Sequence, residues 1–179
     1  MPDINDRIEV VPLRSERLEL EPLQVEHATE MAPLLDDARL HAFIGGEPAS
    51  VEALRERYER QRVGRSADGS ELWLNWILRR IDDGLAVGTV QATVTEWHGR
   101  LAADVAWVIG TAYQGQGYAV EAATAMVDWL ARQGVRSLAA YVHPDHAASI
   151  GVARAIGLKP TEVLVDGEIR WETGLSVLT

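Results

Sequence analysis

One glycine-rich segment carries the clearest chemical signal in this sequence. Residues 108–119 read VIGTAYQGQGYA, an apolar run followed by a turn and then by residues with helical spacing. Glycine lets the backbone approach a ligand closely, and the unpaired amides at a helix N-terminus attract an anion. The segment therefore predicts a phosphate-binding loop, although a glycine turn that only joins a strand to a helix would have the same spacing.

Two well-known phosphate loops do not fit this segment. The dinucleotide fingerprint GxGxxG would need glycine at position 120, which is Val120, and an acidic residue about 20 positions later, where Arg136 and Ser137 stand. A P-loop needs Gly-Lys-Ser/Thr, which the chain lacks. Neither a dehydrogenase nor a P-loop NTPase is supported.

Other polar residues suggest further chemistry. Asp104 interrupts the apolar run ADVAWVI, where a carboxylate is unexpected, and this makes it a candidate general base. The alternative is an aspartate on the solvent side of a strand. His143 and His146 form an H-x-x-H pair, but no cysteine or further clustered ligand accompanies them, so we expect no metal site.

Composition limits the classes of protein that the chain can belong to. Its 179 residues suit one domain, and 47% apolar with 25% charged residues fits a soluble globular protein. The absence of cysteine excludes disulfides and a thiolate nucleophile. A net charge of −10 disfavours nucleic acid as a partner. Without a leader pattern or an apolar run of about 18 residues, we expect a cytoplasmic protein with no membrane partner.

The pattern of apolar residues predicts a polar tail over 1–12 and a single domain over 13–179. Within the domain, alternating and helical periodicities give the order β α α β β β α β α β β. The expected strands are 17–23, 71–81, 85–97, 101–109, 137–142, 158–165 and 168–177, and the expected helices are 25–40, broken or kinked at Pro33, 50–64, capped by Ser50, 116–133 and 147–156. Three hairpin-linked strands followed by a strand–helix–strand crossover indicate a mixed α/β sheet.

The segment Gln114-Gly-Gln-Gly-Tyr-Ala119 resembles the acyl-CoA pyrophosphate loop of the GNAT N-acetyltransferase superfamily. Other segments of the sequence resemble the RimJ/RimL-type branch of this superfamily. They are RSERLEL at 14–20, GYAVEA at 117–122, and HAAS at 146–149 followed by AIGL at 155–158. The ordered resemblance covers about residues 13–178. Three features depart from the pattern: His146 replaces the usual asparagine, Leu158 replaces the usual phenylalanine after the late glycine, and no tyrosine follows Ser149 in its helix.

The resemblance implies the GNAT fold: a single mixed, mostly antiparallel sheet with a central splayed parallel pair, flanked by about four helices. It places the pantetheine arm of acetyl-CoA along Val108, Ile109 and Gly110, with one main-chain N–H serving the thioester oxygen. It assigns the cofactor contacts beyond that strand to Gln114, Gly115, Gln116, Gly117, Tyr118, Ala119, His146 and Ser149. Ser149 would contact the cofactor or protonate the leaving thiolate, unless it only caps its helix.

The function implied is an acetyl-CoA-dependent N-acetyltransferase without a metal. An acetyl group would pass directly to a primary amine, on a protein N-terminus or a small molecule, within a ternary complex and with Asp104 or an ordered water as base. Glu121 either shares in this chemistry or only favours the positive end of its helix. The alternative is a catalytically weak acyl-CoA-binding or sensing protein. Either could be a monomer or a homodimer.

Overall fold

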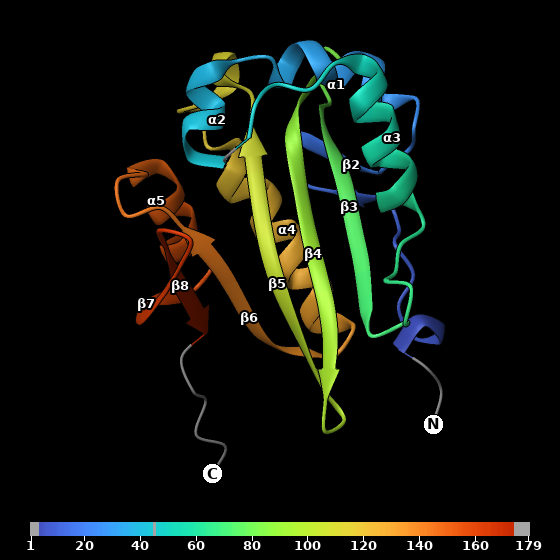
Figure 1. Ribbon diagram of the computed structural model, residues 1–179, viewed down its shortest axis with the longest axis vertical. Coiled ribbons are helices and arrows are strands. Elements are labelled where there is room, and N and C mark those ends of the chain that lie inside the picture. Colours follow the sequence, from blue (N-terminus) through green and yellow to red (C-terminus); the bar gives the residue numbers. More distant parts are fainter. Residues whose placement is uncertain (1–3, 45, 174–179) are drawn as a thin grey trace.

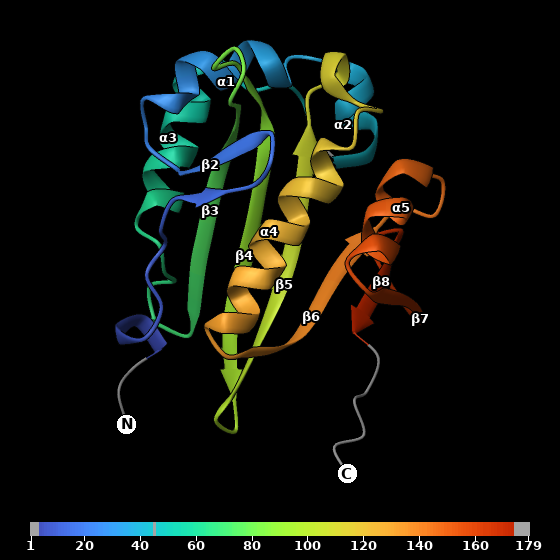
Figure 2. The same ribbon diagram turned by 180° about the vertical axis from the view of Figure 1, so that it is seen from behind.

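The computed structural model describes residues 4–44 and 46–173, which form one eight-stranded sheet with helices on both faces (Figures 1 and 2). The strand order is β1-β2-β3-β4-β5-β6-β8-β7, and within the described residues only β5 and β6 run parallel. This confirms the predicted mixed, mostly antiparallel α/β sheet. The strands are β1 (Leu13–Arg14), β2 (Leu18–Pro22), β3 (Glu71–Arg80), β4 (Ala86–Trp97), β5 (Arg100–Ile109), β6 (Val135–Val142), β7 (Leu158–Val165) and β8 (Glu168–Thr173).

Five α-helices are described, compared with the expected four or so. They are α1 (His27–Leu35), α2 (Ala38–Ile44), α3 (Val51–Arg62), α4 (Tyr118–Arg132) and α5 (Ala147–Ala155). The extra helix arises because the segment expected as one helix over 25–40 is divided. Pro33, which lacks an N–H, lies in the last turn of α1, and the chain leaves the helical conformation at Asp36 before α2 begins. Ser50 caps α3 as predicted, accepting from Ala53 N at 3.2 Å.

The two ends of the chain differ in detail from the sequence-based outline. In the segment expected to be a tail, Ile4 and Ile8 are both buried in the same apolar cluster as the sheet residues. Residues 1–3 lie outside the described residues. The last expected strand, 168–177, is described as β8 to Thr173, and its remainder also lies outside.

Successive side chains of the central strands point to opposite faces of the sheet, and both faces carry buried apolar residues. On one face Trp76 and its neighbours pack against α4, with the Trp76 and Trp129 rings edge to face at 5.6 Å. On the other face Ile77 packs beneath α1 and α3, against Met31 and Leu54. Figure 1 shows α4 behind the sheet and α3 in front of it, and Figure 2, seen from the other side, shows α4 in front. The central strands therefore have buried surfaces on both sides.

The parallel pair separates halfway along its length. β5 pairs with β6 only from Leu101 to Asp104, which faces Ala139, while β5 continues unpaired on that side to Ile109. The glycine-rich segment and the start of α4 follow directly, so the opening between the strands lies beside the predicted phosphate loop. The short 3₁₀ turn Thr111–Tyr113 joins the end of β5 to the glycines that precede α4.

Gly88 of β4 leaves no room for a side chain, because a Cβ there would lie 2.1 Å from the Val108 carbonyl oxygen of β5. We predict that Gly88→Ala destabilises the protein by roughly 1–3 kcal/mol, because the strands must move apart. Thermal unfolding should show this as a lower Tm. Gly151→Ala is the control: its Cβ meets nothing within 4 Å and it lies inside α5, so alanine should raise the Tm slightly. An unchanged Tm in Gly88→Ala would contradict the assigned register.

Candidate active site

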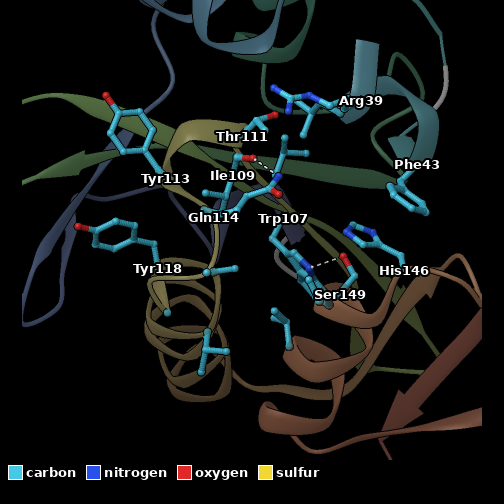
Figure 3. Close-up of a pocket in the computed structure, with 18 residues that line it drawn as sticks. Arg39, Phe43, Trp107, Ile109, Thr111, Tyr113, Gln114, Tyr118, His146 and Ser149 are labelled. Atoms are coloured by element: carbon cyan, nitrogen blue, oxygen red, sulfur yellow. Dashed lines mark hydrogen bonds between the residues drawn. The ribbon is translucent and has the colours of Figure 1, made fainter. Parts of the chain in front are cut away.

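A cleft of about 530 Å³ opens where β5 and β6 separate (Figure 3). It is bordered by the end of β5, the glycine loop with the start of α4, the start of α5, and α2. Most of the residues predicted to bind the cofactor line it: Val108, Ile109, Gln114, Gly115, Gly117, Tyr118, Ala119, His146 and Ser149. Gly110 and Gln116 belong to the same segments but do not line the cleft.

The loop has the geometry of an anion cradle. Gly115 and Gly117 both adopt left-handed conformations, with φ of 76° and 83°. The side chain of Gln114 folds back, and its Nε2 donates to the Ile109 carbonyl at 3.0 Å. The first bond of α4 runs from Glu121 N to the carbonyl of Gly117, so the amides of residues 118–120 have no helical acceptor. These three residues border the cleft, where their amides can serve an anion.

Glu121 holds this loop from outside the cleft. Its carboxylate accepts from Ser15 Oγ at 2.6 Å, from Arg17 N at 3.0 Å and from Arg17 Nε at 2.8 Å. Burial opposes ionisation, but these hydrogen bonds outweigh it and lower the pKa of Glu121. Arg17 also donates to the Gln116 carbonyl at 3.0 Å and lies 4.5 Å from the centre of the Tyr118 ring. Glu121 therefore has a positioning role in this structure.

The edge of β5 that faces the cleft presents main-chain groups. Gly110 N donates to the Val87 carbonyl at 2.9 Å, so this amide is already used on the β4 side. Val108 pairs with Thr89 in the same antiparallel register. Because N–H groups alternate in direction along a strand, those of Trp107 and Ile109 point to the other side, where β6 has diverged. Of the three residues 108–110, Ile109 has the amide directed at the opening.

Ser149 faces the cleft from the first turn of α5. Its Oγ accepts a hydrogen bond from Trp107 Nε1 at 3.3 Å, drawn as a dashed line in Figure 3. The N-cap of α5 is His146, three residues before Ser149, so Ser149 does not cap this helix. An indole N–H can only donate, so the Ser149 proton is free to point elsewhere.

His146 closes one side of the cleft through a ring stack. Its imidazole lies parallel to the ring of Phe43 of α2, with centroids 4.2 Å apart, and His143 meets the same phenyl ring edge-on at 5.7 Å. Burial, and secondly the charge of His143, lower the pKa of His146. The ring is therefore neutral at pH 7 and able to offer or accept one hydrogen bond. Among the described residues, no three potential metal ligands come together.

Asp104 lies outside the cleft. It is on β5 at the last paired position before the strands separate, with its side chain 56% exposed and 3.8 Å from Arg170 Nη1. Burial raises the pKa of Asp104, and the positive charge of Arg170 opposes this shift. Val108 is four positions after Asp104 on the same strand, a distance of roughly 13 Å at about 3.3 Å per residue.

The cleft also contains residues that sequence analysis did not select. Arg39, Leu40 and Phe43 come from α2, which was expected to be part of a longer helix ending at residue 40. Leu40 and Phe43 follow Arg39 by one and four positions, which places all three on one side of a helix. This spacing could have indicated from sequence that they act together. Arg39 is held by Asp37 through two bonds, Nε to Oδ1 at 3.2 Å and Nη2 to Oδ2 at 2.9 Å.

Solved structures with this fold include several ribosomal-protein acetyltransferases. RimL, a ribosomal L7/L12 α-N-protein acetyltransferase bound to coenzyme A, is 19% identical with a TM-score of 0.74, over 92% of this chain and 97% of that one. *Mycobacterium smegmatis* RimJ with CoA-disulfide is 20% identical with a TM-score of 0.74, over 94% and 88%. The *Salmonella typhimurium* enzyme that modifies the N-terminal serine of L7/L12 is 17% identical, TM-score 0.73, over 90% and 98%.

Sequence comparison gives the family directly. No curated protein matches the chain. The family model described as "Acetyltransferase (GNAT) domain" matches residues 17–159, which contain the splayed strands, the glycine loop and the start of α5. The match covers most of the chain, and the sheet with its single described parallel pair agrees with it. The chain belongs to the GNAT acetyltransferase family.

Proposed function

We propose that this acyltransferase moves an acetyl group from acetyl-CoA directly to a primary amine. The observation that carries the proposal is the continuity of the cleft: a cradle of main-chain amides leads to an unpaired strand edge and then to the Ser149 hydroxyl. This sequence of donors suits a molecule with a phosphate group at one end and a thioester at the other. RimL and RimJ, which share the fold, were solved with CoA or a CoA disulfide.

The donor set fits acetyl-CoA even though the protein is acidic. The pyrophosphate would lie on the amides of residues 114–119, so that backbone dipoles rather than lysines meet its charge. Arg39 adds one guanidinium at the rim of the same cleft. The pantetheine arm would follow the free edge of β5, with Ile109 N–H toward the thioester oxygen and His146 near the amides of the arm. A net charge of −10 then does not prevent the binding of an anion.

Transfer requires few protein groups. A neutral amine attacks the thioester carbonyl carbon, the C–S bond breaks, and the electron pair leaves on sulfur. The Ile109 N–H would stabilise the developing oxyanion. Ser149, whose oxygen accepts from the Trp107 N–H, would donate a hydrogen bond to the departing thiolate, which takes up a proton from water. The ordinary pKa of a thiol, about 8.5, makes this help optional.

The amine proton would leave through water. Asp104 is too far along β5 to reach an amine at Val108 directly, but it lies on the same strand face and can end a short chain of waters. The acceptor would be a protein N-terminus or a small-molecule amine. RimL and the *Salmonella* enzyme act on ribosomal protein L7/L12, the latter on its N-terminal serine.

One observation favours a second candidate, a catalytically weak acyl-CoA-binding or sensing protein. Among the described residues that line the cleft, none is a carboxylate, and the one histidine, His146, is stacked on the ring of Phe43. This alternative predicts cofactor binding without turnover. The two functions share the cleft and differ only in the chemistry at its inner end.

Two-substrate kinetics test the proposed function. We expect acetyl-CoA and a primary amine to release free CoA thiol, which a thiol-reactive dye detects without background because the protein has no cysteine. Double-reciprocal lines should intersect, since both substrates must be bound for direct transfer. Parallel lines, or a protein that gains the mass of an acetyl group from acetyl-CoA alone, would contradict direct transfer. Binding of CoA without thiol release across an amine panel would support the sensing protein.

Gly117→Val should weaken CoA binding by more than about tenfold. A side chain at φ 83° is strained, and its Cβ would lie 3.3 Å from Arg17 Nη2, so the cradle must change shape. Calorimetric titration with CoA measures the effect. Gly167→Val is the matched control, because that residue has φ 81° but lies in the β7–β8 turn away from the cleft. Equal CoA affinity in the two variants would remove the loop from the binding site.

Asp104→Asn should lower kcat by less than about tenfold. A direct base would lose roughly 10²–10⁴, whereas a residue that only ends a water chain contributes less. In the wild-type protein, kcat/KM should rise toward alkaline pH, as the acceptor amine loses its proton. A thousandfold loss, together with a changed pH profile, would make Asp104 the direct base and would require an acceptor position far from Val108.

A further inference from the structure

The Trp107 side chain joins β5 to α5 across the inner end of the cleft (Figure 3). By alternation along β5 it lies on the α4 side of the sheet, opposite to Asp104 and Val108. It is partly buried and packs against the main apolar cluster, and its backbone pairs with Val90 of β4. The indole is therefore held in place before any ligand enters the cleft.

The direction of the hydrogen bond between Trp107 and Ser149 is fixed by the chemistry of indole. Nε1–H can only donate, so the Ser149 oxygen is the acceptor in this 3.3 Å contact. A tyrosine in the same place could donate or accept, and a phenylalanine could do neither. The indole thus occupies one lone-pair direction of the hydroxyl and excludes the hydroxyl hydrogen from that direction.

The usual acceptors for such a serine on α5 are already engaged. A serine in a helix can donate to a carbonyl three or four residues earlier, which here belong to His146 and Asp145. These carbonyls accept from Ile150 N at 3.0 Å and from Ala147 N at 3.2 Å. Within the described residues, the bond from the indole is the only hydrogen bond of the Ser149 side chain. The hydroxyl hydrogen is left to point into the cleft that Ser149 lines.

We propose that Trp107 is a positioning residue, which turns the Ser149 hydroxyl toward the sulfur of bound acetyl-CoA. A hydroxyl that accepts one hydrogen bond becomes a stronger donor of another, because the two bonds polarise each other. The donated bond matters most when the C–S bond breaks and negative charge collects on sulfur. This inference rests on the proposed acetyl transfer and adds the group that gives Ser149 its direction.

A double-mutant cycle of Trp107→Phe and Ser149→Ala tests the inference. Transfer is measured in a single turnover, so that product release does not conceal the step. We expect Trp107→Phe to lower the transfer rate about three- to tenfold and Ser149→Ala to lower it about tenfold. Adding Trp107→Phe to Ser149→Ala should change the rate less than about twofold, because the hydroxyl that the indole directs is gone. Losses that multiply, or no loss in Trp107→Phe alone, would overturn the inference.

Two controls separate positioning from folding. The affinity for CoA, measured by calorimetric titration, should change less than about twofold in Trp107→Phe, because the charge on sulfur develops only during transfer. Trp73→Phe is the matched variant, since it also removes an indole N–H bond, from Nε1 to Glu71 Oε2 at 3.0 Å, but Trp73 does not line the cleft. Its transfer rate should equal that of the wild-type protein. An equal loss of rate in both tryptophan variants would overturn the assignment.

If the wild-type protein acetylates no amine in a panel, the proposed transfer fails and bound CoA decides about Trp107. A hydroxyl directed at sulfur favours the thiolate and lowers the pKa of the bound CoA thiol. Ultraviolet difference absorbance against the same protein with desulfo-CoA, which lacks the sulfur, follows this ionisation, since the chain has no cysteine. We expect a higher thiol pKa in Trp107→Phe and in Ser149→Ala than in the wild-type protein. The same thiol pKa in Trp107→Phe and the wild-type protein would overturn the inference.

Discussion

The separation of β5 from β6 after Asp104 is the constraint on which the site depends. Up to that residue the two strands satisfy each other's main-chain groups, and beyond it the edge of β5 loses its partner. Unpaired main-chain groups inside a protein need another partner. The cleft is the space in which a ligand can provide it, and the loop, α2 and α5 are arranged around this open edge. A longer parallel pairing would fill the same space with β6.

Two tight contacts keep the strand edge in place. Gly88 lets β4 come close to the Val108 carbonyl, and Gly110 donates to Val87 at the end of the same pair. Farther along, the carboxylate of Glu121 fixes Arg17 and Ser15 against the start of α4. The cradle is therefore rigid on its outer side, while its inner side consists of backbone amides. This division lets an acidic protein present a local site for an anion.

Much of the fold could be predicted because its signals are local. The turns at Asp82-Asp83-Gly84 and at His98-Gly99 mark two hairpins, and the glycine loop is readable from spacing and resemblance. The position of Asp104 on an exposed strand face was also accessible, since Leu101, Ala103 and Val105 alternate with it and are buried. Its selection as a base depended instead on the apolar composition of the whole segment.

Contacts between distant segments could not be predicted in this way. The stack of Phe43 on His146 joins α2 to α5, and no periodicity links residues a hundred positions apart. Tyr58 lies in a helix rich in arginine and glutamate, which from sequence alone is typical of a solvated surface. Only the packing of α3 on the sheet shows that Tyr58 is buried. These residues depend on tertiary structure, and single-sequence patterns do not contain it.

The bond between Arg17 and Glu121 has a consequence for how the protein acquires its cradle during folding. The loop is local in sequence, but its supporting contacts span 104 positions, so it belongs to the high-contact-order part of the fold. A nascent chain that has formed the β3–β5 meander and α4 still lacks the final loop shape until the N-terminal strand docks. The loop thus reaches its final shape only when the N-terminal edge of the sheet has docked, and a fragment that begins after β2 would keep the glycines without the contacts from Ser15 and Arg17.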